Sequence, residues 1–153
     1  LNSESVMSTF FIPPSDTSQP FVRPSSVLPA AGAYDPSPTI IPCEGQTELV
    51  FMITYLRAAV GGSVSFKVEF SDDKVTWFQT SHLGAPTFTA AVDSVFGLQR
   101  AEVKYTSTSA SQENFMSPSF TVAARWARIS CKESGVIGSA GTVSVRLQQR
   151  GSY

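Results

Sequence analysis

Few side chains in this sequence could carry out chemistry, and their spacing does not combine them into a catalytic pattern. His82 is the single histidine, and Ser81 precedes it. A Ser-His-Asp triad also needs a serine on a constrained turn, and the chain lacks a Gly-x-Ser-x-Gly motif. Asp72 and Asp73 are adjacent acids, whereas a calcium site takes roughly six to eight oxygen ligands from a patterned loop. We therefore interpret His82 as a polar surface residue and the two aspartates as turn residues.

Carboxylates, aromatic rings and thiols offer further candidate sites. A glycosidase needs two carboxylates about 5–9 Å apart across a cleft. The glutamates on expected strands or strand ends, which we interpret as solvent-facing, are Glu48, Glu69, Glu102 and Glu133. Trp77 and Trp126 are expected in the core, with sugar-stacking platforms as the alternative. Cys43 and Cys131 are expected to be free, with a disulfide between them as the alternative. The sequence thus predicts no catalytic, metal-binding or cofactor-binding residue, and we expect a protein that is not an enzyme.

Composition limits the partners that the chain can bind. It has 153 residues, of which 42% are hydrophobic and 15% are charged, and its net charge is −1. A protein that neutralises nucleic-acid phosphates or an anionic membrane surface needs an excess of cations. The longest apolar run, Leu49–Ile53, is far shorter than the ~20 residues of a membrane-spanning helix. We therefore expect neither nucleic acid nor a membrane as a partner.

The first 42 residues differ in composition from the rest, because they hold eight of the ten prolines. Proline fixes φ and removes a backbone donor, so residues 1–42 are expected to form an extended arm rather than a helix or a central strand. Apolar side chains recur between these prolines and need a surface on which to pack. The residues that we expect to contact a partner are Phe10, Phe11, Ile12, Phe21, Val22, Ile40 and Ile41. A flexible leader is the alternative to a partner-binding arm. The first residue is Leu1 rather than methionine, which indicates a chain that was trimmed, processed or numbered from mid-sequence.

From Thr47 onward the pattern is typical of short strands separated by polar turns. Glu48–Arg57 is almost wholly apolar, which predicts a strand covered on both faces. Ser63–Phe70 alternates, with Ser65, Lys67 and Glu69 expected to face solvent, and it forms a hairpin with Val75–Thr80. The remaining expected elements are strands at Ala85–Val92, Arg100–Thr106, Phe120–Cys131 and Thr142–Gln149, and a short helical turn at Asp93–Leu98.

These elements predict an all-β protein with two parts. Residues 43–153 are expected to form a jelly-roll-like antiparallel β-sandwich, and the extended proline-rich arm of residues 1–42 precedes it. An immunoglobulin-like sandwich is the alternative. It would suit the order Cys43, Trp77, Cys131, although Cys43 precedes the first strand of the sandwich.

One segment carries a resemblance to known proteins. Val64–Trp77, which reads VSFKVEFSDDKVTW, resembles the "VEYSxDGxxW" strand–turn–strand pattern of galactose-binding-like jelly rolls and phage virion proteins. The stretches Ala124–Ser130 and Gly141–Leu147 are similar to the closing strands of the same sandwiches. One departure is Lys74 at the usual glycine of the turn, so the turn need not take the glycine-dependent form.

Combined with the apolar arm, the chain resembles a phage capsid decoration (cement) or auxiliary virion protein. The resemblance implies a homo-oligomer, with a trimer favoured, seated on the major capsid protein at the surface of the virion. Its arm would contact neighbouring virion subunits and stabilise the particle. Two alternatives remain at this stage. One is a carbohydrate- or receptor-binding module of a phage tail or surface protein, and the other is a hydrolase that depends on His82.

Overall fold

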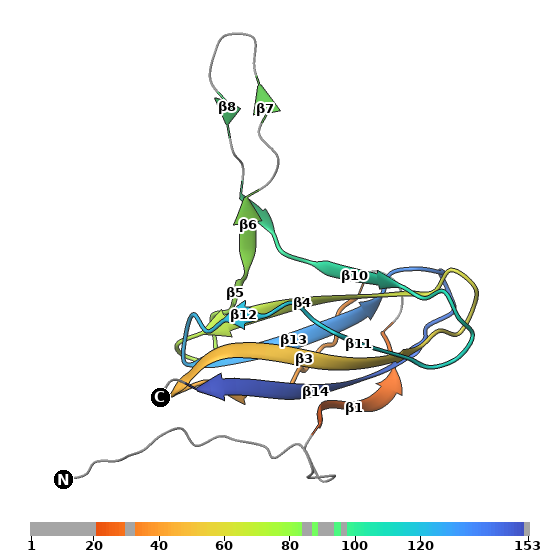
Figure 1. Cartoon of the computed structure of the whole chain (residues 1–153), viewed down its shortest axis with the longest axis horizontal. Helices are drawn as coiled ribbons and strands as arrows, with labels where there is room; N and C mark the ends of the chain where they lie inside the picture. Colours follow the sequence, from red (N-terminus) through yellow and green to blue (C-terminus); the bar gives the residue numbers. More distant parts are fainter. Residues whose placement is uncertain (1–20, 30–32, 84–86, 89–93, 96–97, 152–153) are drawn as a thin grey trace, which may run out of the picture.

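The computed structural model of the chain describes residues 21–29, 33–83, 87–88, 94–95 and 98–151 (Figure 1). Within these ranges the regular elements are all strands. They are β1 (Phe21–Val27), β2 (Ile41–Pro42), β3 (Gln46–Leu56), β4 (Ser63–Ser71), β5 (Phe78–Gln79), β6 (Ser81–Leu83), β7 (Thr87–Phe88), β8 (Ser94–Val95), β9 (Leu98–Arg100), β10 (Val103–Thr106), β11 (Glu113–Met116), β12 (Phe120–Thr121), β13 (Trp126–Glu133) and β14 (Thr142–Gly151). In the part of the chain that is described, no helix is long and apolar enough to cross a membrane.

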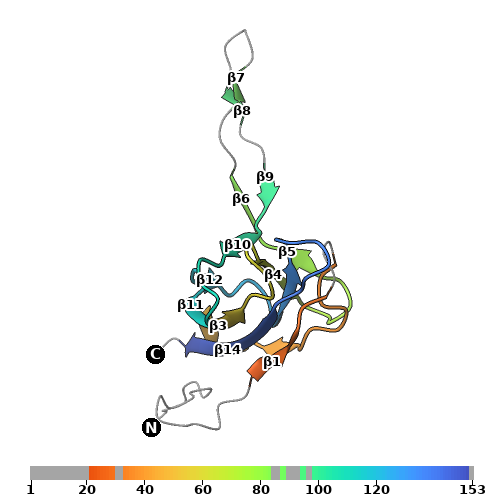
Figure 2. The ribbon, with the colours of Figure 1, turned by 90° about the vertical axis from the view of Figure 1, so that its right-hand side faces the viewer.

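Two five-stranded antiparallel sheets pack face to face (Figures 1 and 2). Sheet A has the order β1-β14-β3-β11, and β12 also pairs with β3. Sheet B has the order β10-β4-β13-β2, and β5 also pairs with β4. The expected all-β, antiparallel β-sandwich is confirmed.

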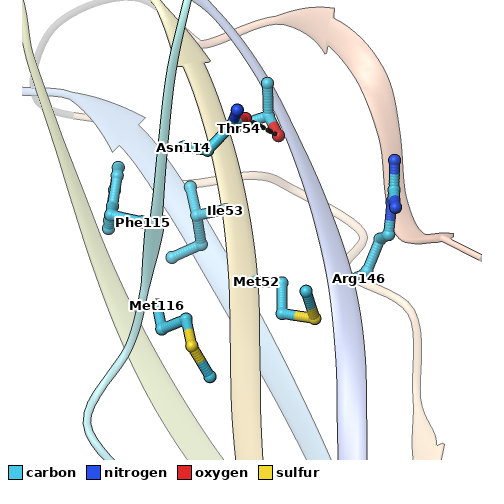
Figure 3. Close-up of a pocket in the computed structure, with 7 residues that line it drawn as sticks. All are labelled: Met52, Ile53, Thr54, Asn114, Phe115, Met116 and Arg146. Atoms are coloured by element: carbon cyan, nitrogen blue, oxygen red, sulfur yellow. Dashed lines mark hydrogen bonds between the residues drawn. The ribbon is translucent and has the colours of Figure 1, made fainter. Parts of the chain in front are cut away.

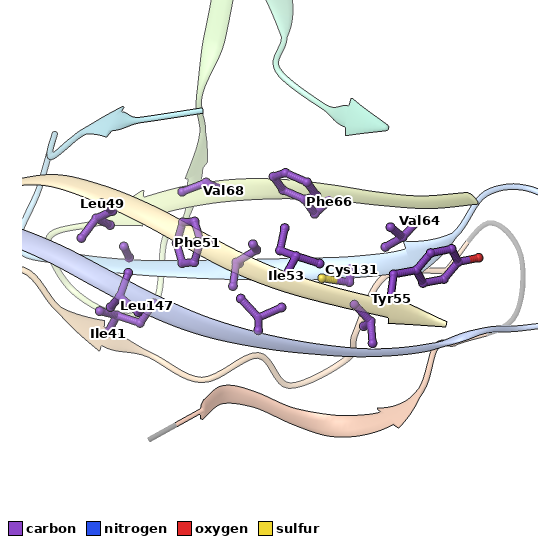
Figure 4. Packing of buried hydrophobic residues seen from close by; sticks show 14 of the residues in the cluster. Ile41, Leu49, Phe51, Ile53, Tyr55, Val64, Phe66, Val68, Cys131 and Leu147 are labelled. Atoms are coloured by element: carbon purple, nitrogen blue, oxygen red, sulfur yellow. The ribbon is translucent and has the colours of Figure 1, made fainter. Parts of the chain in front are cut away.

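The core lies between the two sheets and follows the period-two rule of strands (Figure 4). Along β3, the side chains of Leu49, Phe51, Ile53 and Tyr55 point inward and are buried. They meet an inward-facing row of β4 that includes Phe66. The inner faces of β13 and β14 complete the core with Ala127, Ile129, Cys131, Val143, Val145 and Leu147.

The outer face of β3 is open, contrary to the prediction that this strand is covered on both faces. Met52 and Leu56 are 38% and 40% exposed. A sandwich has only two layers, so the central strand of sheet A has one face in the core and the other toward solvent. Met52 and Leu56 are therefore surface residues, whereas Val50 at the same outer face is covered and is 9% exposed.

In β4 the opposite deviation occurs, because side chains expected to face solvent are covered. Ser65 and Glu69 are buried on the outer face of sheet B. The Ser65 hydroxyl donates to the Ser134 hydroxyl at 2.8 Å, and the Arg128 guanidinium donates to the Glu69 carboxylate at 2.9 Å. Polar side chains from neighbouring elements thus cover Ser65 and Glu69. The alternation of residue types within one strand gives no information about such cover.

The N-terminal part of the described chain belongs to the sandwich. β1 pairs with β14 at the edge of sheet A, and β2 pairs with β13 at the edge of sheet B. Pro24 lies in β1 where the register shifts, which is the position that a strand proline requires. Arg23 binds Asp35 through its Nε at 2.9 Å and donates to the carbonyl of Val143 at 2.6 Å. The expected boundary after residue 42 therefore falls inside the folded domain.

Two expected partner-contact residues contribute to the sandwich. Ile41 is 3% exposed and lies in the core, and Val22 packs against the core from β1. Ile41 pairs with Ala127 and is turned inward, whereas Val22 is half-buried. Phe21 and Ile40 point the other way and are 42% and 40% exposed. Phe10, Phe11 and Ile12 lie outside the described residues.

Two short ladders stand away from the sandwich (Figure 2). β6 pairs with β9, and β7 pairs with β8. The helical turn expected at Asp93–Leu98 is not found at Ser94–Val95, which is strand β8, nor at Leu98, which begins β9. The remainder of the expected strand Ala85–Val92, apart from β7, lies outside the described residues.

Candidate functional site

A transverse row of side chains crosses the outer face of sheet A. Strand pairing aligns Phe21 of β1 with Arg146 of β14, Arg146 with Met52 of β3, and Met52 with Met116 of β11. Met116 is 63% exposed, and the Arg146 guanidinium lies 5.0 Å from the centre of the Phe21 ring. Register alone therefore places three large apolar side chains and one cation side by side on a rigid surface.

The row borders a hollow of about 350 Å³ (Figure 3). Met52 and Met116 lie at one end of it, and Thr54 and Asn114 lie at the other, joined by a 2.8 Å hydrogen bond from the Thr54 hydroxyl to the Asn114 side-chain carbonyl. A second hollow of about 370 Å³ adjoins it on the same face, beyond this hydrogen bond. The volume of each lies at the lower end of the range for small-ligand pockets, roughly 300–1,000 Å³.

The chemistry of this face favours binding over catalysis. Among the described lining residues of the first hollow, Arg146 is the charged group and no carboxylate, histidine or cysteine is present. Methionine side chains are flexible and polarisable, and their sulfur atoms make favourable contacts with aromatic rings. The site is therefore suited to an apolar or aromatic group that carries a negative charge or an acceptor near Arg146.

The outer face of sheet B has a different character, and it holds both tryptophans. The expectation of core tryptophans is wrong, because Trp77 and Trp126 are half-buried and lie on this outer face. The Lys74 ammonium lies 3.9 Å from the centre of the Trp126 ring, and the Arg128 guanidinium lies 4.2 Å from that of Trp77. Each indole thus has one face in a cation–π contact within the chain.

Tyr34 covers part of the same face from the segment that follows β1. Its ring centre lies 4.7 Å from the ammonium of Lys67 and 4.6 Å from that of Lys132. Its hydroxyl donates to the Glu102 carboxylate. Tyr105 of β10 stacks on Phe115 of β11 with ring centres 4.1 Å apart, so this ring pairs with an aromatic residue of the other sheet rather than with a cation.

The remaining candidates from the sequence have structural roles or lie apart. His82 is exposed on β6. Asp73 accepts hydrogen bonds from the backbone amides of Thr76 and Val75 and from the Ser71 hydroxyl, which lower its pKa to about 2. The reading of Asp73 as a turn residue is confirmed. Lys74 has a φ of 65°, so it takes the left-handed conformation that glycine favours at this position of the turn.

Glu133 corrects the reading of the glutamates as solvent-facing. It is 0% exposed, and its carboxylate accepts hydrogen bonds from the Tyr55 hydroxyl and from the backbone amides of Ser63, Gly135 and Gly141, at 2.8–3.0 Å. These bonds join β3, β4 and β13 to the loop before β14. Burial, with a smaller effect of the Glu133 carboxylate, raises the pKa of Tyr55.

The two cysteines are free and buried, as expected. Burial raises the pKa of the Cys43 thiol to about 11 and that of Cys131 to about 12. Such thiols are weak nucleophiles and weak metal ligands at neutral pH. In the described ranges, no three side chains among histidine, cysteine, aspartate and glutamate gather as a metal site would require.

Sequence reasoning found one member of the row on sheet A, Phe21, and missed Met52, Met116 and Arg146. The signal was present in β3, where every second residue must face outward once the fold is a two-layer sandwich. Met52 and Leu56 are apolar residues at such positions, and their exposure marks a surface patch. Comparison with known proteins adds no further assignment: no family model matches the chain, and no curated protein or solved structure shows significant similarity.

Proposed function

We propose that this chain is a non-enzymatic structural protein of a virus particle. It binds the major capsid protein, or neighbouring virion subunits, at the capsid surface and stabilises the particle. The viral part of the proposal rests on the resemblance of Val64–Trp77 to the strand–turn–strand pattern of phage virion proteins. The proposed form is a homo-oligomer, a trimer by the same resemblance.

The observation that carries the binding role is the exposed apolar row on sheet A. Met52 and Met116 are direct neighbours, Phe21 lies one strand further beyond Arg146, and Leu56 extends the apolar surface along β3. Burying apolar area in an interface yields about 25 cal/mol per Å², so such a patch is a natural contact for a second protein. Contacts repeated by the symmetry of a shell raise the avidity of each weak interaction.

The ladder of β6 and β9 supports the same role. These strands pair with each other away from the sandwich, and Leu98 at the start of β9 is 74% exposed. A two-stranded hairpin is at best marginally stable in water by itself. Of the residues between Ser81 and Arg100 inclusive, only Asp93 and Arg100 are charged. A weakly charged ladder of this kind would gain stability by packing against a neighbouring protein.

The proposal is tested by co-sedimentation of the full chain with shells assembled from the major capsid protein of the same virus. Met116→Asp places a charge in the apolar row and is expected to weaken association at least about tenfold, or ~1.4 kcal/mol. Ile137→Asp is the matched control, since Ile137 is 88% exposed and lies in the loop between β13 and β14. Equal binding by both variants and the wild type would refute this interface, and absence of wild-type binding would refute the function.

A second candidate function, a carbohydrate- or receptor-binding module, is favoured by one observation. Trp77 and Trp126 are partly exposed on the same outer face of sheet B. Arg128 and Lys74 already occupy one face of each ring, so a sugar would have to stack on the other. Titration of tryptophan fluorescence with a panel of sugars tests this function, and an unchanged emission across the panel would exclude these rings as sugar platforms.

A further inference from the structure

The chain enters the sandwich beside the hollow on sheet A. β1 begins at Phe21, whose ring lies on the outer face next to Arg146, in the same transverse row as Met52 and Met116. Twenty residues precede Phe21 and lie outside the described part of the chain. Any path that they take starts at one end of this row.

We propose that Phe10 and Phe11 of the same chain cover the hollow between Met52 and Met116. Three strand-to-strand steps of ~4.8 Å separate Phe21 from Met116, a distance of ~15 Å. The eight residues from Pro13 to Pro20 span up to ~26 Å when extended, at ~3.3 Å per residue. The tether is therefore long enough to bring both phenylalanines over the hollow.

The chemistry of the segment matches that of the face. Phe10 and Phe11 are the aromatic residues of positions 1–20, and thioether sulfurs such as those of Met52 and Met116 favour aromatic partners. The segment contains acidic residues and neither lysine nor arginine, whereas the charged group of the hollow is the Arg146 guanidinium. Its prolines restrict the free chain and so lower the entropic cost of docking.

The tether also favours the chain's own segment over that of another copy. A short linker gives an effective concentration on the order of millimolar, above the micromolar concentrations of a dilute protein solution. The inference goes beyond the proposed function because it describes the free subunit. A partner that uses this face must first displace Phe10 and Phe11. Its apparent affinity is then the intrinsic affinity multiplied by the fraction of chains in which the face is open.

Methyl NMR of the full chain tests this contact. The protein contains three methionines, so ¹³C-methyl labelling gives signals for Met7, Met52 and Met116, which Met52→Leu and Met116→Leu assign. In the wild type, ring currents are expected to shift the Met52 and Met116 methyl signals. The double variant Phe10→Ser/Phe11→Ser is expected to lose both shifts. Phe78→Ser removes a 66% exposed phenylalanine of β5, in sheet B, and is expected to leave both signals unchanged.

Dilution and mixing decide whether the segment acts within its own chain. The shifts are expected to persist on dilution to a monomer, with the mass followed by light scattering. Unlabelled wild type added to the labelled double variant is expected to leave the Met52 and Met116 signals of that variant unchanged. Restoration of the shifts on mixing, or their loss on dilution, would assign the face to a second copy and overturn the proposal. Identical signals in wild type and double variant would also overturn it, without bearing on shell binding.

Discussion

On the outer face of sheet B, aromatic rings lie against cations of the same chain, whereas on the outer face of sheet A the methionines lie in the open. Trp77 and Trp126 each contact a cation at about 4 Å, and Arg128 also binds the buried Glu69. In the row on sheet A, Arg146 is the single cation, and it contacts Phe21. The two tryptophans of sheet B thus have partners within the chain, while the row on sheet A keeps Met52 and Met116 partly exposed.

This difference separates two physical tasks. A polar group that is covered must keep its hydrogen bonds, so the acids of sheet B are tied to the stability of the fold. An apolar group that stays exposed contributes little to folding and is free to contribute to binding. The comparison predicts that substitutions on sheet B lower the free energy of unfolding and that substitutions in the row on sheet A lower binding instead.

The largest effect is expected for Glu133→Gln in β13. The amide NH2 would replace one carboxylate oxygen and would then face donors on either side, the Tyr55 hydroxyl with the Gly141 amide or the amides of Ser63 and Gly135. An unsatisfied buried donor costs about 1–3 kcal/mol, so we expect a loss of about 3 kcal/mol in the free energy of unfolding, measured by urea denaturation. Glu44→Gln, at an exposed residue, is the control. A loss below about 1 kcal/mol would show that the Glu133 carboxylate is not essential to the stability of the sandwich.

A smaller effect is expected for Glu69→Ala on the outer face of sheet B. Glu69 binds Arg128 at 2.9 Å and Lys67 at 3.6 Å, and these cations are partly exposed and can regain water. We expect a loss of about 1–2 kcal/mol in urea denaturation, against less than about 0.5 kcal/mol for Glu44→Ala. If both variants unfold at the same urea concentration, the ion pairs on the outer face of sheet B do not contribute to stability. The predicted difference between the two outer faces would then be wrong for Glu69.

The sandwich itself could be predicted from the sequence, because alternation in β4 and β14 reports one buried face directly. Two positions show the limit of that signal. Met52 is apolar but faces outward, and Glu133 is charged but faces inward. The sequence of a single strand does not show whether one or both of its faces are covered. It also does not show which backbone amides from distant loops lie next to a carboxylate. Both depend on how the strands pair in the folded chain.

The N-terminal segment shows a second limit. Its prolines correctly exclude a helix, but an edge strand tolerates proline at a bulge, and Pro24 of β1 lies at such a position. The link between Arg23 and Asp35 joins residues that are twelve positions apart, without any periodic pattern. Composition therefore identified an unusual segment without showing that β1 and β2 pair with the chain's own sheets. Of the candidate site, Phe21 was found through its apolar character, whereas its neighbours in the row depend on strand register.

A pH dependence is expected from the turn between β4 and β5. The pKa of Asp73 is lowered to about 2 by amide and hydroxyl donors, so its carboxylate stabilises the fold at a pH above its ordinary pKa of about 4. This contribution is lost as the pH falls through 2. Asp73→Asn keeps the acceptor oxygen but removes the charge, so the stability gap between wild type and variant should be constant from pH 7 to about 5 and should narrow as the pH falls from about 4 to 2. A gap in urea denaturation that is as large at pH 2 as at pH 7 would contradict this origin.

The smallest effect on stability is expected for Met52→Ser combined with Met116→Ser. These side chains are 38% and 63% exposed, so their loss removes little buried apolar area, and we expect a change below about 1 kcal/mol in the free energy of unfolding. Ile53→Ala provides the matched control, because this neighbour in β3 is 1% exposed, and its truncation should cost about 2–5 kcal/mol. If the methionine pair costs as much as Ile53, the row on sheet A serves the fold. If the methionine pair costs little stability while shell binding is lost, the inner face of β3 serves folding and its outer face serves binding.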